Sequence, residues 1–225
     1  MKVTILGAGR MGSAMAARLA DTGHLVTVWD RNPDHAGRLV EVGVTAAADA
    51  AQAVTDASVV ITMVTNGEAV QAVAEQMLPA MRPDAVWVQA STVGADWADR
   101  LRALADANHR TMLDAPVSGS TTPARTGKLS WLVAGPSTGV EAARPVLDAL
   151  GERVLFVGTG QEASRLKLVV NTWMTAATVA MADALAACDR LGIDRSALLE
   201  VVSDGPLAMP YALQKAQLMT DHDFT

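Results

Sequence analysis

The chain has 225 residues, of which 50% are hydrophobic and 19% are charged, a composition typical of an ordered, compact protein. Its formal net charge of −6 argues against a nucleic-acid partner, because no surplus of basic residues is available to neutralise a phosphate backbone. Cys188 is the single cysteine, which excludes an internal disulfide and a CxxC metal site. The four histidines show no metal-ligand spacing, so we expect no metal.

Short apolar runs alternate with Ala-rich amphipathic segments up to about residue 157. The apolar runs predict strands at residues 2–6, 25–29, 58–63, 85–89, 111–114, 130–133 and 153–156. The amphipathic segments predict helices at residues 11–21, 33–42, 67–80, 95–107 and 137–150. Nearly continuous apolar strands separated by helices indicate a mostly parallel sheet covered on both faces, which is the doubly wound α/β architecture.

The pattern changes after Gly160, where residues 161–191 predict one long helix that stops at Gly192. Shorter helices are predicted at residues 195–203 and about 207–219. Apolar residues lie almost all round the long helix, so we expect neighbours to bury it on several sides. We therefore predict an α/β domain over residues 1–160 and an incomplete all-α domain over 161–225. A further C-terminal part or a partner subunit is expected to cover that second domain.

The longest apolar stretch is interrupted by Lys167 and Asn171, so we expect no membrane span. The first apolar run is followed directly by glycines and Arg10, which is unlike a secretory signal. The cytoplasm is therefore the expected compartment.

A glycine-rich segment, Gly7-Ala8-Gly9-Arg10-Met11-Gly12, joins the first predicted strand to the first predicted helix. In a GxGxxG loop of this kind the first glycine permits a tight turn and the second lets the backbone approach a pyrophosphate. The third allows close packing of helix and strand. The N–H groups at the start of the helix then bind the phosphates, which predicts a Rossmann-type dinucleotide site.

The second predicted strand ends at Asp30, 18 residues after Gly12 (30 − 12). A carboxylate at this place accepts hydrogen bonds from the ribose hydroxyls of a dinucleotide and repels a 2′-phosphate, which favours NAD. Arg31 follows directly, and its guanidinium could pair with a 2′-phosphate, which leaves NADP open.

Two further groups of polar residues carry possible chemistry. Lys167 and Asn171 are four residues apart on one face of the long helix. Desolvation lowers the pKa of a buried lysine towards the range useful for proton transfer. The pattern also fits a lysine that extends its charged end to water and an asparagine that bonds to a neighbouring helix. The segment from Asp114 to Ser120 follows a strand and suits a carboxylate ligand, or is an ordinary turn.

These motifs, in this order, resemble the β-hydroxyacid dehydrogenase family, relatives of 3-hydroxyisobutyrate and tartronate semialdehyde dehydrogenases and of 6-phosphogluconate dehydrogenase. The loop from Gly7 to Gly12 is similar to the family's cofactor loop. Leu113-Asp114-Ala115-Pro116-Val117-Ser118-Gly119, continuing through Gly127-Lys128-Leu129, is similar to its substrate signature. Gly160 followed by Lys167-Leu168-Val169-Val170-Asn171 is similar to its catalytic helix.

The resemblance implies hydride transfer between a nicotinamide cofactor and a small carboxylate substrate. Lys167 would be the general acid/base and Asn171 would orient the substrate hydroxyl or the lysine. The substrate would contact Ser118, Gly119, Ser120 and Thr92, and the cofactor would contact Gly7, Gly9, Arg10, Met11, Gly12, Asp30, Arg31, Val64, Thr65 and Thr92. The C-terminal helices would assemble a homodimer or a higher homo-oligomer.

The chain departs from the family pattern in three ways. Ser120 stands where many members have a second glycine, as in the glyoxylate and succinic semialdehyde reductase branch. Thr172 replaces a frequent second asparagine, and members continue past Thr225 with further helices. Two alternatives stay open: an imine reductase-like NADPH enzyme, against which Lys167 counts, and a non-catalytic dinucleotide-binding or oligomerisation module.

Overall fold

The computed structural model describes residues 1–223, and contacts divide the chain into two compact units. The first unit is Met1–Lys167, and the second begins at Leu168. Each unit is described by itself below.

The first unit is built on a mostly parallel sheet with the order β3-β2-β1-β4-β5-β6-β8-β7, in which β9 pairs with β8. The first six strands are parallel to one another. The β8 strand runs antiparallel to both β6 and β7, and β9 is parallel to β8. The strands are β1 (Lys2–Leu6), β2 (Leu25–Trp29), β3 (Thr45–Ala46), β4 (Val59–Thr62), β5 (Val86–Gln89), β6 (Thr111–Asp114), β7 (Val117–Ser118), β8 (Leu129–Ala134) and β9 (Gly151–Gly158).

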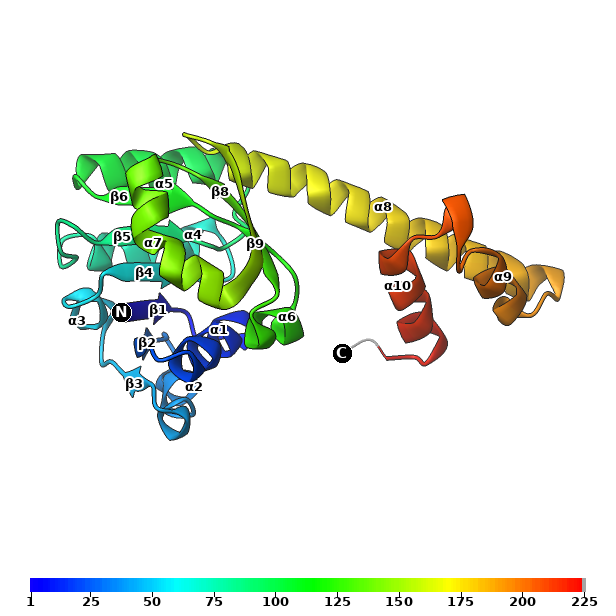
Figure 1. The fold of residues 1–225 in the computed structure, drawn as a ribbon, viewed down its shortest axis with the longest axis horizontal. Helices are drawn as coiled ribbons and strands as arrows, with labels where there is room; N and C mark the ends of the chain where they lie inside the picture. The colour runs from blue at the N-terminus through cyan, green and yellow to red at the C-terminus, as the bar shows by residue number, and fades with distance from the viewer. Residues whose placement is uncertain (224–225) are drawn as a thin grey trace. The chain divides into compact units, whose positions relative to one another are not determined.

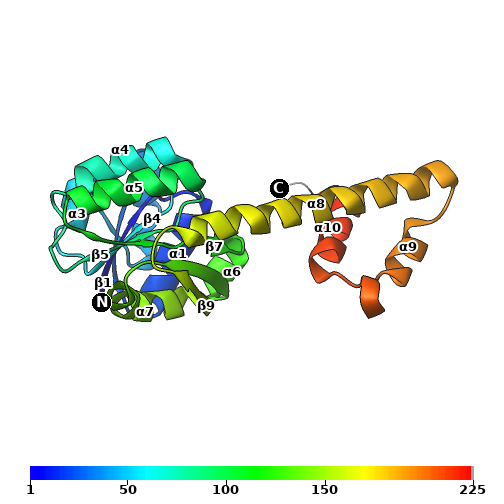
Figure 2. The same ribbon diagram turned by 90° about the horizontal axis from the view of Figure 1, so that it is seen from above.

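Helices cover both faces of this sheet (Figure 1). One face is packed by α1 (Arg10–Asp21), α6 (Thr121–Thr126) and α7 (Ser137–Leu150). The other face is packed by α3 (Ala50–Val54), α4 (Gly67–Met77) and α5 (Ala95–Ala107). Figure 2 shows α4 and α5 on one side of the sheet and α7 on the other. The short α2 (Pro33–Gly37) and the 3₁₀ turn η1 (Val40–Val42) follow β2.

The central strands are buried on both faces, which is why their sequences are apolar without alternation. All four residues of β4 and all four of β5 are buried. The stripe of α1 that faces the sheet carries Met15, Ala16 and Leu19, each fully buried. The fold class predicted from the sequence, a doubly wound α/β domain followed by a helical part, is therefore confirmed.

The predicted elements need three corrections. The predicted helix at 33–42 is split into α2 and η1, because Gly37 ends the first turns and Leu39 returns to the core. The sequence prediction omitted β3, α3, β7 and α6, which have only two to six residues each and lack a readable period. The mostly parallel sheet also contains antiparallel pairs at β8, because the chain between β6 and β8 passes only through β7 and the six-residue α6.

The second unit consists of most of α8 (Glu162–Leu191), α9 (Arg195–Val201), the 3₁₀ turn η2 (Gly205–Leu207) and α10 (Pro210–Thr220). Within it, α10 packs on α8 through Tyr211, whose ring lies 6.3 Å from that of Trp173 and whose hydroxyl accepts from Thr178 Oγ1 at 3.3 Å. The buried residues of α10 are Ala212 and Ala216.

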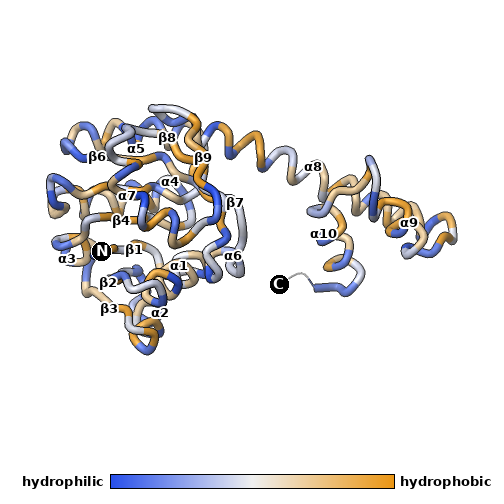
Figure 3. Tube along the Cα trace, in the orientation of Figure 1, coloured by the Kyte–Doolittle hydropathy of each residue, from blue (hydrophilic) through white to orange (hydrophobic). Residues whose placement is uncertain are grey.

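The long helix α8 is only partly covered by the other described helices of the second unit. Val169, Trp173 and Val179 are 65%, 53% and 53% exposed, because only α9 and α10 are available within the second unit to cover them. Figure 3 shows the apolar residues along α8. Of the helices in the described chain, α8 alone is long and apolar enough to cross a membrane by length and composition, a test that core helices of soluble proteins also pass.

Candidate functional site

The glycine loop between β1 and α1 has the backbone shape that the motif predicts. Gly7 has φ +108°, a conformation that disfavours other residues, and a Cβ there would overlap the carbonyl oxygen of Met63. A Cβ on Gly12 would overlap the carbonyl oxygen of Gly7. By contrast, a Cβ on Gly9 would meet nothing within 4 Å. The loop is therefore tight towards the protein and open on the side where a pyrophosphate would approach.

The N-terminus of α1 is free to bind an anion. Gly9 is its N-cap and provides no side-chain hydrogen bond, and the first turn carries no acidic residue. The first N–H groups of a helix have no partner within the helix, and the helix dipole places partial positive charge there. Arg10 is exposed beside this end and Met11 is half-buried. This arrangement has the shape and polarity that the pyrophosphate of a dinucleotide needs, and its binding by this loop stays a prediction.

Asp30 lies at the end of β2 and holds the glycine loop in place. Its Oδ2 accepts a hydrogen bond from the N–H of Ala8 at 2.7 Å, and its Oδ1 accepts from the N–H of Asn32 at 2.8 Å. His35 Nδ1 lies 3.3 Å from the same Oδ1. Sequence reasoning missed this contact. The available signal was the position of His35, five residues after Asp30 on the short helix that follows β2. Arg31 is exposed.

A buried polar network lies beneath the loops that follow β4 and β5. The Gln89 carboxamide accepts from the Ser91 N–H and donates to the Ser91 carbonyl, each at 2.8 Å. The Gln89 oxygen also accepts from the Thr62 hydroxyl at 3.2 Å, and that hydroxyl accepts from Trp87 Nε1 at 3.0 Å. Ser91 Oγ accepts from the Val64 N–H at 2.9 Å. Because these four side chains are fully buried, they fix the two loops against each other.

The predicted contact residues Val64, Thr65 and Thr92 are on these two loops. Val64 is half-buried with its N–H bound by Ser91, whereas Thr65 and Thr92 are exposed. Sequence reasoning missed Gln89 and Ser91 as supporting residues. A polar residue at the last position of an apolar strand was the signal that could have found Gln89.

The predicted substrate segment leaves the sheet at the end of β6 and continues through β7. Ser118 pairs with Ser130 of β8 and is half-buried, while Gly119 and Ser120 are exposed. Gly119 has φ +134°, and a Cβ there would lie 2.8 Å from the Leu129 side chain. Ser120 has an extended backbone, which any residue adopts, so its departure from the family glycine causes no strain.

Lys167 is 7% exposed, on the part of α8 that belongs to the first unit. Burial lowers the pKa of its ammonium group below the ordinary 10.5. Its neighbour Ser164 bonds to Asp114 of β6, so this turn of α8 lies at the carboxyl-terminal edge of the sheet. Asn171, one turn further along α8, belongs to the second unit and lines a hollow with Tyr211 there.

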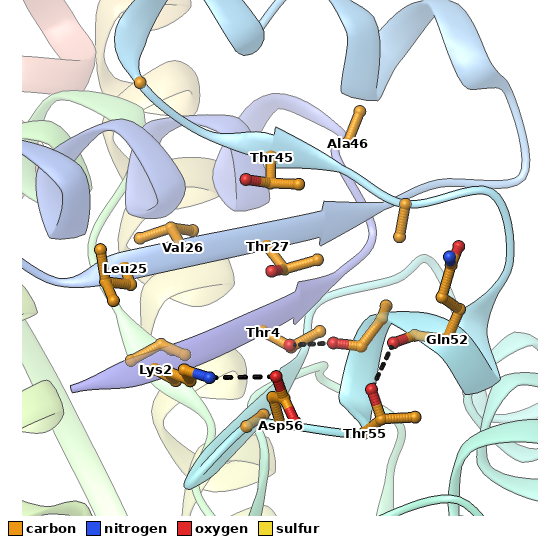
Figure 4. A pocket seen from close by; sticks show the side chains of 15 residues that line it. Lys2, Thr4, Leu25, Val26, Thr27, Thr45, Ala46, Gln52, Thr55 and Asp56 are labelled. Atoms are coloured by element: carbon orange, nitrogen blue, oxygen red, sulfur yellow. Dashed lines mark hydrogen bonds and ion pairs between the residues drawn. The ribbon is translucent and has the colours of Figure 1, made fainter.

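A separate hollow of about 300 Å³ lies over the opposite ends of β1 and β2, beside α3 (Figure 4). Its polar groups largely pair with one another: Lys2 binds Asp56 at 3.0 Å, and Thr55 Oγ1 donates to the Gln52 carbonyl at 3.1 Å. Thr4 Oγ1 donates to the carbonyl of residue 53. None of the predicted site residues lines this hollow. Residues 1–223 also contain no group of three or more side chains suited to hold a metal ion.

The carboxyl-terminal edge of the sheet therefore brings together the glycine loop, Asp30, the loops after β4 and β5, and the first turn of α8. Ligands of open α/β sheets bind at this edge, beside the strand where the order reverses, here β1 between β2 and β4. The fold and site define a dinucleotide-binding protein of the Rossmann class.

Comparisons with known proteins narrow this class. The family model for the NAD binding domain of 6-phosphogluconate dehydrogenase matches residues 2–158. The chain therefore belongs to the β-hydroxyacid dehydrogenase family, within the 6-phosphogluconate dehydrogenase superfamily. It is an NAD(P)-dependent oxidoreductase that transfers a hydride between the nicotinamide and a small β-hydroxy acid or its semialdehyde.

Individual relatives agree with this assignment. The 3-hydroxyisobutyrate dehydrogenase of Pseudomonas aeruginosa is 34% identical over 203 residues, which cover 89% of this chain and 68% of that protein. The solved structure of Mycobacterium tuberculosis 3-hydroxyisobutyrate dehydrogenase with L-serine has a TM-score of 0.86 at 30% identity, covering 93% of this chain and 72% of that one. An imine reductase of Streptomyces aurantiacus has a TM-score of 0.82 at 24% identity, covering 99% and 75%, a likeness that shows the fold alone.

Proposed function

We propose that Lys167 is the general acid/base of this dehydrogenase. The observation that carries the proposal is a lysine 7% exposed, with its pKa lowered by burial, on a turn that contacts the sheet edge holding the cofactor loops. A partly desolvated amine whose pKa is lowered is suited to exchange a proton with a substrate hydroxyl.

The proposed roles in the reaction are divided between the cofactor, the long helix and the loops at the sheet edge. The nicotinamide group supplies the chemistry of accepting or donating a hydride. Lys167 removes the hydroxyl proton during oxidation and returns it during reduction, and Asn171 orients the hydroxyl. Residues 118–120 bind the substrate carboxylate with backbone N–H groups and hydroxyls, while Thr92 lies between cofactor and substrate. Residues 1–160 hold the cofactor and residues 161–225 contribute to the substrate side.

We propose a substrate that carries a carboxylate and a hydroxyl on the β-carbon. The relatives named for 3-hydroxyisobutyrate, and the relative solved with L-serine, support this class, because both compounds share that pattern. The polar character of residues 118–120 agrees with a small anionic group rather than an apolar amine.

We propose NAD as the preferred cofactor. The Asp30 carboxylate lies where it would accept from the ribose hydroxyls, and its charge opposes a 2′-phosphate. Arg31 is exposed and His35 contacts Asp30. These two side chains could reduce the repulsion between the Asp30 carboxylate and a 2′-phosphate, and so admit NADP.

We also propose that the protein is cytoplasmic and self-associates through the helices after residue 161. The exposed apolar side chains of α8 support self-association, since burying them in a second copy would remove them from water. Sedimentation velocity over a range of protein concentrations tests this, and a single monomeric species throughout would contradict it.

The test of the central proposal is a Lys167→Ala variant. General acid–base catalysis contributes about 10²–10⁴-fold, so we expect oxidation of 3-hydroxyisobutyrate or L-serine to fall by about that factor. Binding of NADH, followed by its fluorescence, should stay within about twofold, because the glycine loop is untouched. Lys2→Ala is the matched control, because Lys2 is exposed at the opposite end of β1 and pairs only with Asp56. Turnover of Lys167→Ala at the wild-type rate would show that another group moves the proton.

A further inference from the structure

A buried carboxylate joins the end of β6 to the helix that carries Lys167. Asp114 is the last residue of β6 and is 1% exposed, and Ser164 in the first turn of α8 is 3% exposed. Ser164 donates its backbone N–H to Asp114 Oδ2 at 2.7 Å and its hydroxyl to Asp114 Oδ1 at 2.5 Å. Both carboxylate oxygens are therefore used by a single residue of α8.

This contact caps the helix from another element. Because α8 begins at Glu162, the Ser164 N–H is among the first four of the helix and has no partner within it. A carboxylate near the start of a helix also interacts favourably with its dipole. Burial raises the pKa of the Asp114 carboxyl, so the side chain is held there in spite of a desolvation cost.

Neighbouring contacts restrict the same turn. Ala163 is fully buried in a small cluster with Leu132 and Ala134 of β8. Arg165 forms an ion pair with Asp99 of α5 at 3.0 Å, but these side chains are 55% and 50% exposed, and exposed pairs of this kind stabilise weakly. The hydrogen bonds between Asp114 and Ser164 are thus buried polar contacts that hold the turn preceding Lys167.

Asp114 is poorly suited to bind the substrate itself. Its two oxygens already accept hydrogen bonds, and its negative charge would repel a substrate carboxylate. The next residues of the chain, 115–120, form the rest of the predicted substrate segment. One residue therefore lies at the junction between that segment and the helix of Lys167.

We propose that Asp114 is a positioning residue, which fixes the first turn of α8 and thereby the placement of Lys167 relative to the substrate segment that begins after β6. Ser164 and Lys167 are three residues apart, so they lie on the same face of the helix, and both are buried. A shift of the first turn moves both side chains together. The inference rests on the proposed role of Lys167.

The expected effect is on turnover more than on cofactor binding. A displacement of about 1 Å can cost about 10²-fold in rate, so we expect kcat of Asp114→Ala to fall by about 10- to 100-fold. NADH affinity should change by less than about threefold, because the glycine loop has no contact with this pair. In Asp114→Asn the amide oxygen can accept the Ser164 N–H and its NH₂ can donate to the Ser164 hydroxyl, so this variant should keep most of the wild-type kcat.

The experiment compares Asp114→Ala, Asp114→Asn, Ser164→Ala and the matched control Asp99→Asn, which removes only the exposed ion pair. Two readouts are used: kcat and KM with 3-hydroxyisobutyrate and NAD, and hydrogen exchange of the peptide covering residues 160–170. We expect faster exchange and lower kcat in Asp114→Ala and, to a smaller extent, in Ser164→Ala. We expect wild-type behaviour in Asp99→Asn.

Unchanged exchange of residues 160–170 in both Asp114→Ala and Ser164→Ala would overturn the positioning role. Equal loss of kcat in Asp114→Asn and Asp114→Ala would also overturn it, since charge rather than geometry would then matter. If Asp114→Ala does not fold, Ser164→Ala decides the question alone. Hydrogen exchange does not depend on turnover, so it separates this inference from the role of Lys167, which the Lys167→Ala variant tests.

Discussion

Replacing Gln89 with Leu should destabilise the protein strongly and weaken cofactor binding, although Gln89 itself is buried beneath the surface of the site. In the wild type its carboxamide satisfies both the N–H and the carbonyl of Ser91. A leucine has similar volume and fills the space, but it offers neither a donor nor an acceptor. The backbone of Ser91 would then be buried without partners, next to the loop that carries Thr92.

The magnitude follows from the two orphaned groups. A buried polar group left unsatisfied costs about 1–3 kcal/mol, so the Ser91 N–H and carbonyl together cost about 2–6 kcal/mol. The Thr62 hydroxyl still accepts from Trp87 and adds less. Folded domains are stable by only about 5–15 kcal/mol, so the loss is a large share of the total.

Urea unfolding followed by tryptophan fluorescence measures this loss, and NADH fluorescence titration measures the effect on binding. Gln76→Leu is the matched control, because Gln76 lies on an exposed face of α4 and donates only to the Ala72 carbonyl. We expect its free energy of unfolding to stay within about 0.5 kcal/mol of the wild type. A Gln89→Leu variant that unfolds at the same urea concentration as Gln76→Leu would refute the reasoning.

Two further predictions concern cofactor choice and pH. The Asp30→Asn variant removes the charge that opposes a 2′-phosphate, while its amide oxygen can still accept the hydrogen bond from the Ala8 N–H. The ratio of kcat/KM with NADP to kcat/KM with NAD should therefore rise by about tenfold or more, equivalent to about 1.4 kcal/mol. An unchanged ratio would contradict the assignment of Asp30 to the ribose. Lys167→Met should be more resistant to urea than the wild type near neutral pH while losing turnover. The pKa of Lys167 is lower in the folded state than in the unfolded state, so the free energy of unfolding of the wild type rises as the pH approaches 10.5. The difference in stability between Lys167→Met and the wild type should therefore shrink with rising pH. A stability difference that does not depend on pH would contradict the assigned burial of the charge.

Most of the first unit could be predicted from the sequence, because its long elements are periodic and its loops carry glycines with defined backbone needs. Gly7 and Gly12 lie where the loop requires the absence of a side chain. The two-residue strands β3 and β7 escaped prediction, since pairing with β2 and β8 rather than local pattern makes them strands. What covers α8 could not be predicted from the sequence, because periodicity shows which residues are apolar but not what lies against them.

The site could be predicted where a residue of suitable chemistry stands at a position that the motif defines, as for Asp30 after β2. Lys167 was found as a polar residue in an apolar helix, and its burial in the structure agrees with that pattern. The residues that hold these groups were not found. Gln89, Ser164 and His35 act through partners distant in sequence or on short turns, and a single sequence does not reveal such pairs.

The hydrogen bond from the Ala8 N–H to Asp30 affects the rate at which the cofactor binds. The bond joins two groups of the protein, at 2.7 Å, and it holds the glycine loop in its turn shape. A loop ordered in advance loses little conformational entropy when a ligand binds, so more of the contact energy appears as affinity. Association should then be limited by encounter rather than by folding of the loop, and the on-rate for NADH should not depend on a slow rearrangement.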